Sequence, residues 1–268
     1  MLSITVSALI FLAADPAPSP VTLDLGYRQM YDLQFDAAHK TFSSFVRLQP
    51  SDPLGPASDA AAYLFAEMDR LNILQSEFFT HDDNFRHPKK LSPDRAARLA
   101  FNTSIAQAEK LADTILSNTP QDRNALFASL LVRGLRSDYD GLIDKRYLSA
   151  LTDVKTGRQI AEKLLAIDPT FYDAHLAVGL ENYMFSLKAA PMRWFLQLAG
   201  AETDRNRGLE RLRITAQKGN YLKPYARLLL AVAALRDMDK LQAREILSDL
   251  TKQFPHNHLY AEELARLP

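Results

Sequence analysis

The sequence predicts an all-α protein, and three observations lead to that prediction. Glycine is scarce, at 9 of 268 residues, which leaves little room for the tight turns of a β-rich fold. The segments 58–74 and 93–116 are rich in alanine, leucine and charged helix formers. In the second segment, Ala97, Ala100, Ala108 and Leu111 recur at steps of three and four residues or their sums. That spacing places them on one buried helix face.

Composition also limits the classes of function. The chain has 32 Lys+Arg and 32 Asp+Glu, and this net charge of +0 argues against an extended nucleic-acid interface. It has no cysteine, which excludes disulfides, zinc–thiolate sites and a thiol nucleophile. The sequence contains no nucleophile elbow, phosphate-binding glycine loop, dinucleotide fingerprint or His-Glu-x-x-His motif. We therefore expect a non-enzymatic chain with no catalytic residues, no metal and no cofactor.

Residues 1–20 are predicted to be a signal peptide followed by a Pro-rich linker. The run from Ile4 to Ala14 is apolar and ends at Asp15, and eleven residues are too few for a membrane span of about 20. Its length and its small residues Ala13 and Ala14 suit a secretory signal, although the usual preceding Lys or Arg is absent. We expect an exported protein, periplasmic or attached to the envelope, with residues 21–268 forming its helical domain.

Taken in order, the helical segments form five antiparallel pairs and a short last helix. Prolines and a glycine end the second helix of each pair, because proline cannot continue a helix interior. Asp122, Thr170 and Asp239 are placed as N-caps or first-turn residues. The predicted pairs occupy residues 20–50, 57–118, 121–168, 171–219 and 221–254, and a capping helix covers 258–267.

The helix pairs follow a repeated pattern. Leu25-Gly26 on a first helix is followed by Ala38, Phe42 and Phe45 on a second helix, and then by Pro50. The same order of positions recurs near the C-terminus as Leu230-Ala231, Ala243, Leu247, Leu250 and Pro255. It recurs in part as Val178-Gly179. This order resembles the tetratricopeptide repeat (TPR) family, whose unit has 34 residues and whose paired helices stack into an α-solenoid. The resemblance covers about residues 21–256 and implies a TPR-like α-solenoid. Gly157 and Gly208 stand where the family has alanine.

The distances between the closing positions exceed the family unit in the middle of the chain. They are 70, 49, 50 and 36 residues for the successive intervals between Pro50, Pro120, Pro169, Gly219 and Pro255. The excess is assigned to inserts near residues 77–92, 137–149 and 189–205. Joins of one kind emerge on one edge of a solenoid, so the three inserts are expected to share an edge and to form a surface or lid there.

Three segments suggest metal ligands, and each has a simpler interpretation. His81 and His87 flank two aspartates, but a solvated loop of mixed charge is the favoured reading. Asp138 to Tyr147 contains Asp-x-Asp-Gly without the rest of a calcium loop, and a turn before the next helix explains it. The segment 256–258 (His-Asn-His) is read as a structural turn.

Candidate partner-binding residues come from the first helices of the pairs and from the third insert. In the TPR family the first helices line a concave groove, and tyrosine offers a rigid apolar body with one polar tip. Core packing between repeats is the alternative for each tyrosine. Trp194, the single tryptophan, and Arg193 suit a binding hot spot, with packing onto the neighbouring repeat as the alternative. The candidates are Tyr27, Tyr31, Tyr63, Arg133, Glu181, Tyr183, Arg193, Trp194 and Tyr225, with Asn182 and Arg227 as further polar contacts.

These features predict a non-catalytic interaction scaffold of the bacterial cell envelope. Its partner is expected to be a protein or peptide held in the concave groove, by the inserts, or by both, and not a nucleic acid. One alternative is a peripheral membrane or lipid-binding module that uses Met192–Leu198. Another is an accessory domain of an enzyme complex. The partner's identity and the oligomeric state are not encoded in any pattern of the sequence.

Overall fold

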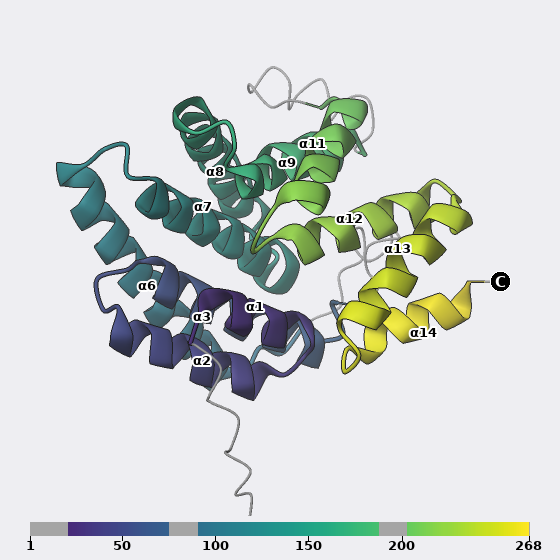
Figure 1. The fold of residues 1–268 in the computed structure, drawn as a ribbon, viewed down its shortest axis with the longest axis horizontal. Helices are drawn as coiled ribbons and strands as arrows, with labels where there is room; N and C mark the ends of the chain where they lie inside the picture. The colour runs from purple at the N-terminus through teal and green to yellow at the C-terminus, as the bar shows by residue number, and fades with distance from the viewer. Residues whose placement is uncertain (1–20, 75–90, 188–202, 268) are drawn as a thin grey trace, which may run out of the picture.

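The computed structural model describes residues 21–74, 91–187 and 203–267, and within them the chain is helical without a strand (Figure 1). The signal-like N-terminus, most of the first and third inserts, His81, His87, Arg193, Trp194 and Met192–Leu198 lie outside these residues. The α-helices are α1 (Leu23–Tyr31), α2 (Phe35–Leu48), α3 (Leu54–Arg70), α6 (Arg95–Asn118), α7 (Arg123–Asp138), α8 (Tyr147–Ile167), α9 (His175–Ser186), α11 (Arg205–Lys218), α12 (Lys223–Arg236), α13 (Lys240–Gln253) and α14 (His258–Arg266). A π-helical segment η1 (Tyr139–Asp144) follows α7, and a 3₁₀ turn η2 (Tyr172–Ala174) precedes α9.

The all-α prediction is confirmed, and most helix ends follow the predicted signals. The helices α2, α6, α8 and α13 each end two residues before a proline, and α11 ends directly before Gly219. Asp122 and Asp239 are N-caps, because their side chains accept hydrogen bonds from Ala125 N and Gln242 N. Thr170 is not a cap. Its hydroxyl and backbone N–H both donate to Asp168, and the 3₁₀ turn η2 starts the next element instead.

Helices that follow one another in the chain pack against one another, and glycines permit the closest contacts. On α1, a Cβ at Gly26 would lie 2.2 Å from the ring of Phe42 on α2. On α11, a Cβ at Gly208 would lie 2.6 Å from the backbone N of Tyr183 on α9. Gly26 thus makes room for an aromatic ring, whereas Gly208 brings two backbones together. The glycine at 208, which departs from the family's alanine, is required by this crossing.

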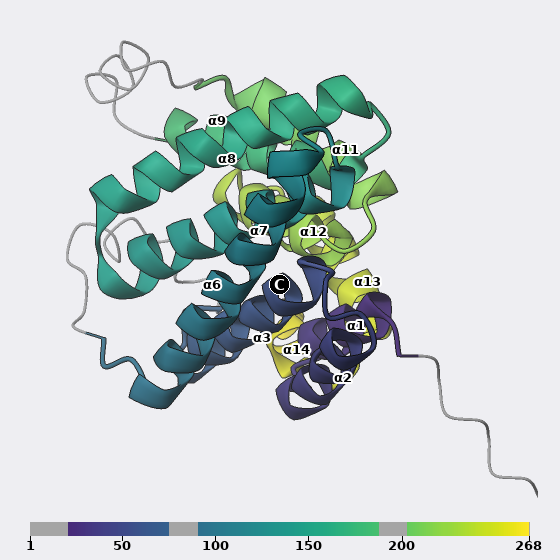
Figure 2. The same cartoon turned by 90° about the vertical axis from the view of Figure 1, so that its left-hand side faces the viewer.

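The series of helix pairs curves until its two ends meet. The views in Figures 1 and 2 agree that α1 lies beside α13 and α14. Asn257 Nδ2 donates to the carbonyl oxygen of Tyr31 over 2.8 Å, and His256 N donates to Asp32 Oδ1 over 2.8 Å. Asn257 also caps α14 by accepting from Leu259 N. The interpretation of the His-Asn-His segment as a structural turn is therefore confirmed, and this turn joins the two ends of the chain.

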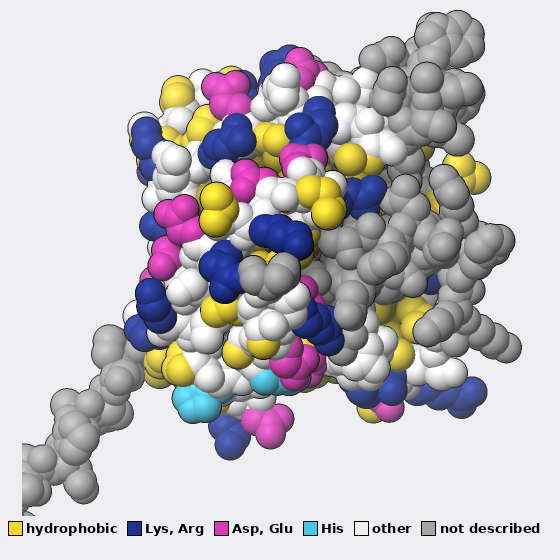
Figure 3. Space-filling view, turned by 90° about the vertical axis from the view of Figure 1, so that its right-hand side faces the viewer, with side chains coloured by type: hydrophobic (Ala, Val, Ile, Leu, Met, Phe, Trp, Pro, Cys, Tyr) yellow, Lys and Arg dark blue, Asp and Glu magenta, His cyan; other side chains and the backbone are white. Residues whose placement is uncertain are grey.

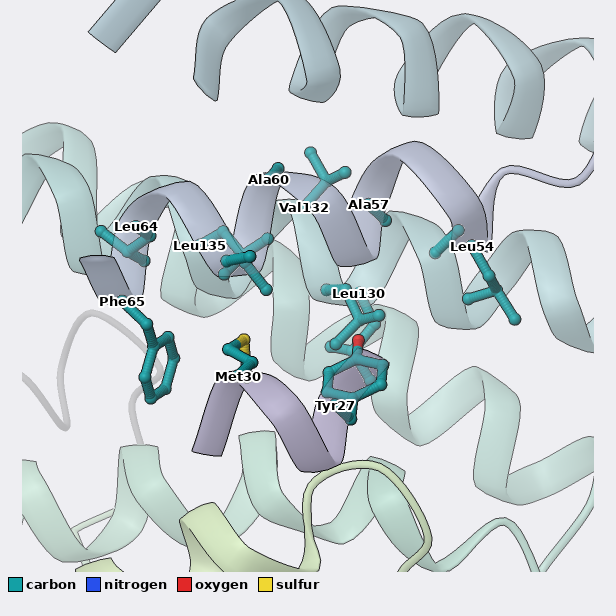
Figure 4. Close-up of a cluster of buried hydrophobic side chains, with 14 of the residues drawn as sticks. Tyr27, Met30, Leu54, Ala57, Ala60, Leu64, Phe65, Leu130, Val132 and Leu135 are labelled. Carbon is teal, nitrogen blue, oxygen red and sulfur yellow. The ribbon is translucent and has the colours of Figure 1, made fainter. Parts of the chain in front are cut away.

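The core fills the inside of this curve. On α3, small residues such as Ala57 and Ala60 are fully buried, so α2, α6 and α7 can approach closely. Tyr27 and Met30 of α1 point toward α3 (Figure 4), where the Tyr27 hydroxyl accepts a hydrogen bond from Ser58 Oγ over 3.2 Å. Leu130, Val132 and Leu135 of α7 complete the same cluster. Helix α1 is thus a central part of the hydrophobic core.

The second insert corrects one expectation. The segment at Asp140-Gly141 is not a simple turn but the π-helical continuation of α7, closed by Lys145 in the left-handed region at φ 60°. Its carboxylates pair with arginines: Asp140 with Arg146, and Asp144 with Arg98. The pair with Arg98 joins η1 to the first turn of α6, and the pair with Arg146 joins it to the start of α8, so the acidic residues of this insert are held by protein groups.

Candidate functional site

A cavity of about 480 Å³ opens where the first helices of the pairs begin. Its wall contains the first residues of α1, α3 and α7, the turn η2 before α9, and Asn220 and Tyr221 of the connection that leads to α12. In antiparallel pairs, every connection from a second helix to the next first helix emerges on the same edge. The starts of the first helices therefore gather at one place, although they are far apart in the sequence. The residues lining this cavity include Thr22, Asp24, Gln49, Asp52, Leu54, Asn124, Phe127, Phe171, Tyr172, Asp173, Lys218, Asn220 and Tyr221.

A second cavity of about 370 Å³ adjoins the first. The two share Gln49, Asp52 and Asn124, and the second adds Ile115 and Asp122. We call the two cavities together the trough. It runs along one edge of the molecule from the start of α1 past the starts of α3 and α7.

Capping side chains bring polar groups to this edge. Asp52 Oδ1 accepts from Leu54 N over 2.9 Å, and Asp122 Oδ1 accepts from Ala125 N over 2.8 Å. Thr22 Oγ1 accepts from Leu25 N over 3.2 Å at the start of α1. Each cap satisfies a backbone N–H that the helix itself leaves without a partner. The same residues that begin the helices therefore supply the rim of the trough.

Asp173 has a structural role on the inner side of the trough. Its carboxylate accepts from the backbone N–H groups of Asn220, Tyr221 and Leu222 over 3.0–3.1 Å and so holds the start of α12. Burial raises the pKa of Asp173, although the three hydrogen bonds act in the opposite direction. Burial also raises the pKa of Tyr221 to about 12, and the nearby carboxylates of Asp24, Asp173 and Asp52 act in the same direction.

The tyrosines proposed to line a concave groove are instead largely enclosed. Tyr27 and Tyr31 are each 4% exposed, and their rings contact aromatic rings from both ends of the chain. The ring centroids of Tyr27 and Tyr221 lie 4.9 Å apart, and those of Tyr31 and Phe254 lie 5.9 Å apart. Tyr225 is half-buried and packs on Phe65 at 5.6 Å. The expectation of an open groove lined by Tyr27 and Tyr31 is wrong, because closure of the helix series fills that space.

The other candidates within the described residues also make contacts between helices. Tyr63 stacks on His39 of α2 at 3.9 Å. Arg133 bridges α6 and α8, at 3.5 Å from Glu109 and 2.9 Å from Asp153. Tyr63 and Arg133 therefore face neighbouring helices rather than a shared binding surface.

The remaining candidates lie on α9 and α12. Glu181 is 2% exposed and lies 3.7 Å from Arg158, and Tyr183 is 2% exposed. Asn182 is fully buried and accepts from Asp204 N at the start of α11. Burial removes these three residues from the accessible surface, which corrects their assignment as exposed contacts. Arg227 pairs with Asp249 on α13 over 2.9 Å.

One interior carboxyl group differs from those of the trough. Asp138 ends α7, and the hydroxyl of Tyr225 on α12 donates a hydrogen bond to it. Burial raises the pKa of Asp138 to about 7, although this hydrogen bond acts in the opposite direction. The π-helical segment η1 begins at the next residue. Both side chains are partly buried, and the hydrogen bond joins the end of α7 to α12, which points to a structural and titratable role.

The described residues were also searched for metal and membrane features. No group of three or more His, Asp or Glu side chains in this part of the chain could hold a metal ion. Among the same residues, none of the helices combines the length and apolarity that crossing a membrane requires.

On the face shown in Figure 3, acidic, basic and apolar side chains are interspersed over the coloured surface rather than gathered by type. Neither a protein-family model nor a curated protein matches this sequence.

Proposed function

We propose that this chain is a TPR-like α-solenoid that acts as a non-catalytic interaction scaffold and holds a segment of a partner protein in the trough. The observation that carries the proposal is the trough itself. It is hollowed, mixed in polarity and accessible, whereas the interior where a groove was expected is filled by aromatic side chains. The trough thus supports a binding function at the edge where the first helices begin.

The repeated helix pairs support this assignment. The first three pairs contribute Thr22, Asp52 and Asp122 to the same edge, and each of these side chains accepts a backbone N–H at the start of a first helix. An extended segment that lies across these turns meets one group after another. The proposed location in the cell envelope rests on residues 1–20 and is independent of the trough.

Site-specific photo-crosslinking tests the proposal. A photoreactive amino acid replaces Asn124, an exposed residue that lines both cavities, in the full chain expressed in its own cells. The control carries the same group at Gln107, an exposed residue of α6 outside the trough. We expect a discrete crosslinked protein from position 124 and none from position 107. Crosslinks from position 107 alone, or identical products from both positions, would contradict binding in the trough.

A further inference from the structure

The charges along the trough are unevenly distributed. Its lining contains the carboxylates of Asp24, Asp52, Asp122 and Asp173 and the cation of Lys218. The Lys218 ammonium lies 5.2 Å from the centroid of the Tyr172 ring. Asp173 already accepts three backbone hydrogen bonds. The charges that remain to meet a ligand are therefore the three carboxylates of Asp24, Asp52 and Asp122 and the single Lys218 ammonium, so negative charge prevails.

Helix N-termini would by themselves favour an anion, so the two effects must be compared. The partial charge at a helix N-terminus is about half an elementary charge. Asp52 and Asp122 each place a full negative charge at such a terminus and accept a first-turn N–H through Oδ1. Among the described residues, their Oδ2 atoms have no hydrogen-bond partner. The two aspartates thus occupy backbone N–H groups that an anion would need as hydrogen-bond donors. Their Oδ2 atoms remain as acceptors for an N–H group of a ligand.

The floor of the trough is apolar and partly aromatic. The partly exposed rings of Phe171 and Tyr221 line the larger cavity, and the fully buried ring of Phe127 supports Phe171, with their centroids 4.9 Å apart. Lysine and arginine side chains lay their methylene stems along apolar surfaces and keep the charged tip in water or near a carboxylate. Aromatic faces also attract such cations. The aromatic floor therefore suits the methylene stem of a lysine or arginine side chain, and the carboxylates at the rim suit its charged tip.

The size of the trough fits a chain segment. The larger cavity, at about 480 Å³, lies within the range of about 300–1,000 Å³ common for ligand sites. The second cavity extends it past Asp122, which gives an elongated rather than a round site. An extended segment could therefore place one side chain near Asp24 and Asp52 and a later one near Asp122.

We propose that the trough selects an extended partner segment that carries lysine or arginine side chains, held between the carboxylates of Asp24, Asp52 and Asp122 and the aromatic floor. This inference rests on the proposed function and adds the chemistry of the segment. An acidic segment is disfavoured, because the same three carboxylates repel it.

Two labelled peptides of equal length test the inference against the full chain by fluorescence anisotropy. The probes are Ac-Lys-Leu-Lys-Leu-Lys-Leu and Ac-Glu-Leu-Glu-Leu-Glu-Leu. We expect the basic peptide to bind at least about tenfold more tightly, with affinity that falls as salt rises. The double variant Asp24→Asn/Asp52→Asn should weaken that binding about tenfold, since asparagine preserves the cap at position 52 and removes the charge.

The matched control is Glu210→Gln/Glu245→Gln, which removes the same charge at exposed residues of α11 and α13 outside the trough. It should bind the basic peptide within about twofold of the unmodified chain. Equal weakening in both double variants would overturn the inference, as would failure of the basic peptide to bind. Preference for the acidic peptide that depends on Asp24 and Asp52 would also overturn it, while leaving binding in the trough intact. The crosslink at position 124 judges the proposed function separately.

Discussion

The interior of the molecule and the trough use the same kinds of side chain, aromatic rings and carboxyl groups, in opposite ways. In the interior, Tyr27 and Tyr31 are buried and Asp138 is bonded by Tyr225. In the trough, the rings of Phe171 and Tyr221 are partly exposed, and carboxylates accept backbone N–H groups at the rim. Under the proposed function, stability resides mainly in the interior and recognition in the trough. A substitution in either region can test this division.

The largest effect on stability is expected from Tyr31→Ala. This change removes a buried ring that contacts Phe65 and Phe254 and a hydroxyl that donates to the carbonyl of Tyr221 over 3.1 Å. We expect the free energy of unfolding to fall by about 3–5 kcal/mol, measured by urea denaturation. The control is Tyr147→Ala, at a tyrosine that is 47% exposed, with an expected change below about 1 kcal/mol. Unchanged stability in Tyr31→Ala would return this residue to the list of candidate binding groups.

The second prediction concerns the carboxyl group of Asp138. Its pKa is raised to about 7 in the folded protein from an ordinary value of 3.8, so the folded state binds the proton more tightly than the unfolded chain. The associated stability is fully present below about pH 4 and is lost as the pH rises through about 7. Asp138→Asn preserves a hydrogen-bond acceptor for Tyr225 and removes the titration.

Urea denaturation at several pH values measures this effect. Between about pH 4 and about pH 8, the free energy of unfolding of the unmodified chain should decline by about 4 kcal/mol more than that of Asp138→Asn. The comparison of the two proteins separates Asp138 from Asp173, whose pKa is also raised by burial. If the free energy of unfolding of the two proteins changes with pH in parallel, Asp138 titrates as an ordinary exposed carboxyl group. The carboxyl groups of the interior and of the trough would then not differ in their pKa.

The positions of the helices could be predicted from the sequence, but the contact between the first and last helices of the series could not. Helix ends follow local signals such as Pro50, Pro120 and Pro255, which act through the backbone of a few neighbouring residues. The contact of Tyr31 with Phe254 joins residues more than two hundred positions apart and depends on the curvature of the whole series. A periodic pattern shows that Tyr31 lies on an inward face but not whether that face remains open.

The trough could have been found in part from the sequence. A closing proline is followed two residues later by an aspartate or asparagine at Pro50-Ser51-Asp52, Pro120-Gln121-Asp122 and Pro255-His256-Asn257. Each of these residues accepts a backbone N–H within its turn. The recurrence places capping side chains on one edge of any series of helix pairs. The depth of the trough and its aromatic floor depend on side-chain packing, which the pattern does not contain.

The smallest effect on stability is expected at the rim, from Asp24→Asn. Asp24 is exposed in the first turn of α1, where its charge interacts favourably with the helix dipole, but Thr22 provides the cap. We expect the free energy of unfolding to fall by about 0.5 kcal/mol or less, with the difference shrinking as salt is added. A loss of about 2 kcal/mol would show that this rim carboxylate supports the core, and the division between a stabilising interior and a recognising edge would then fail. A small loss, together with weaker binding of the basic peptide, is the result that a recognition surface requires, since its charges are then available to a partner rather than engaged in the fold.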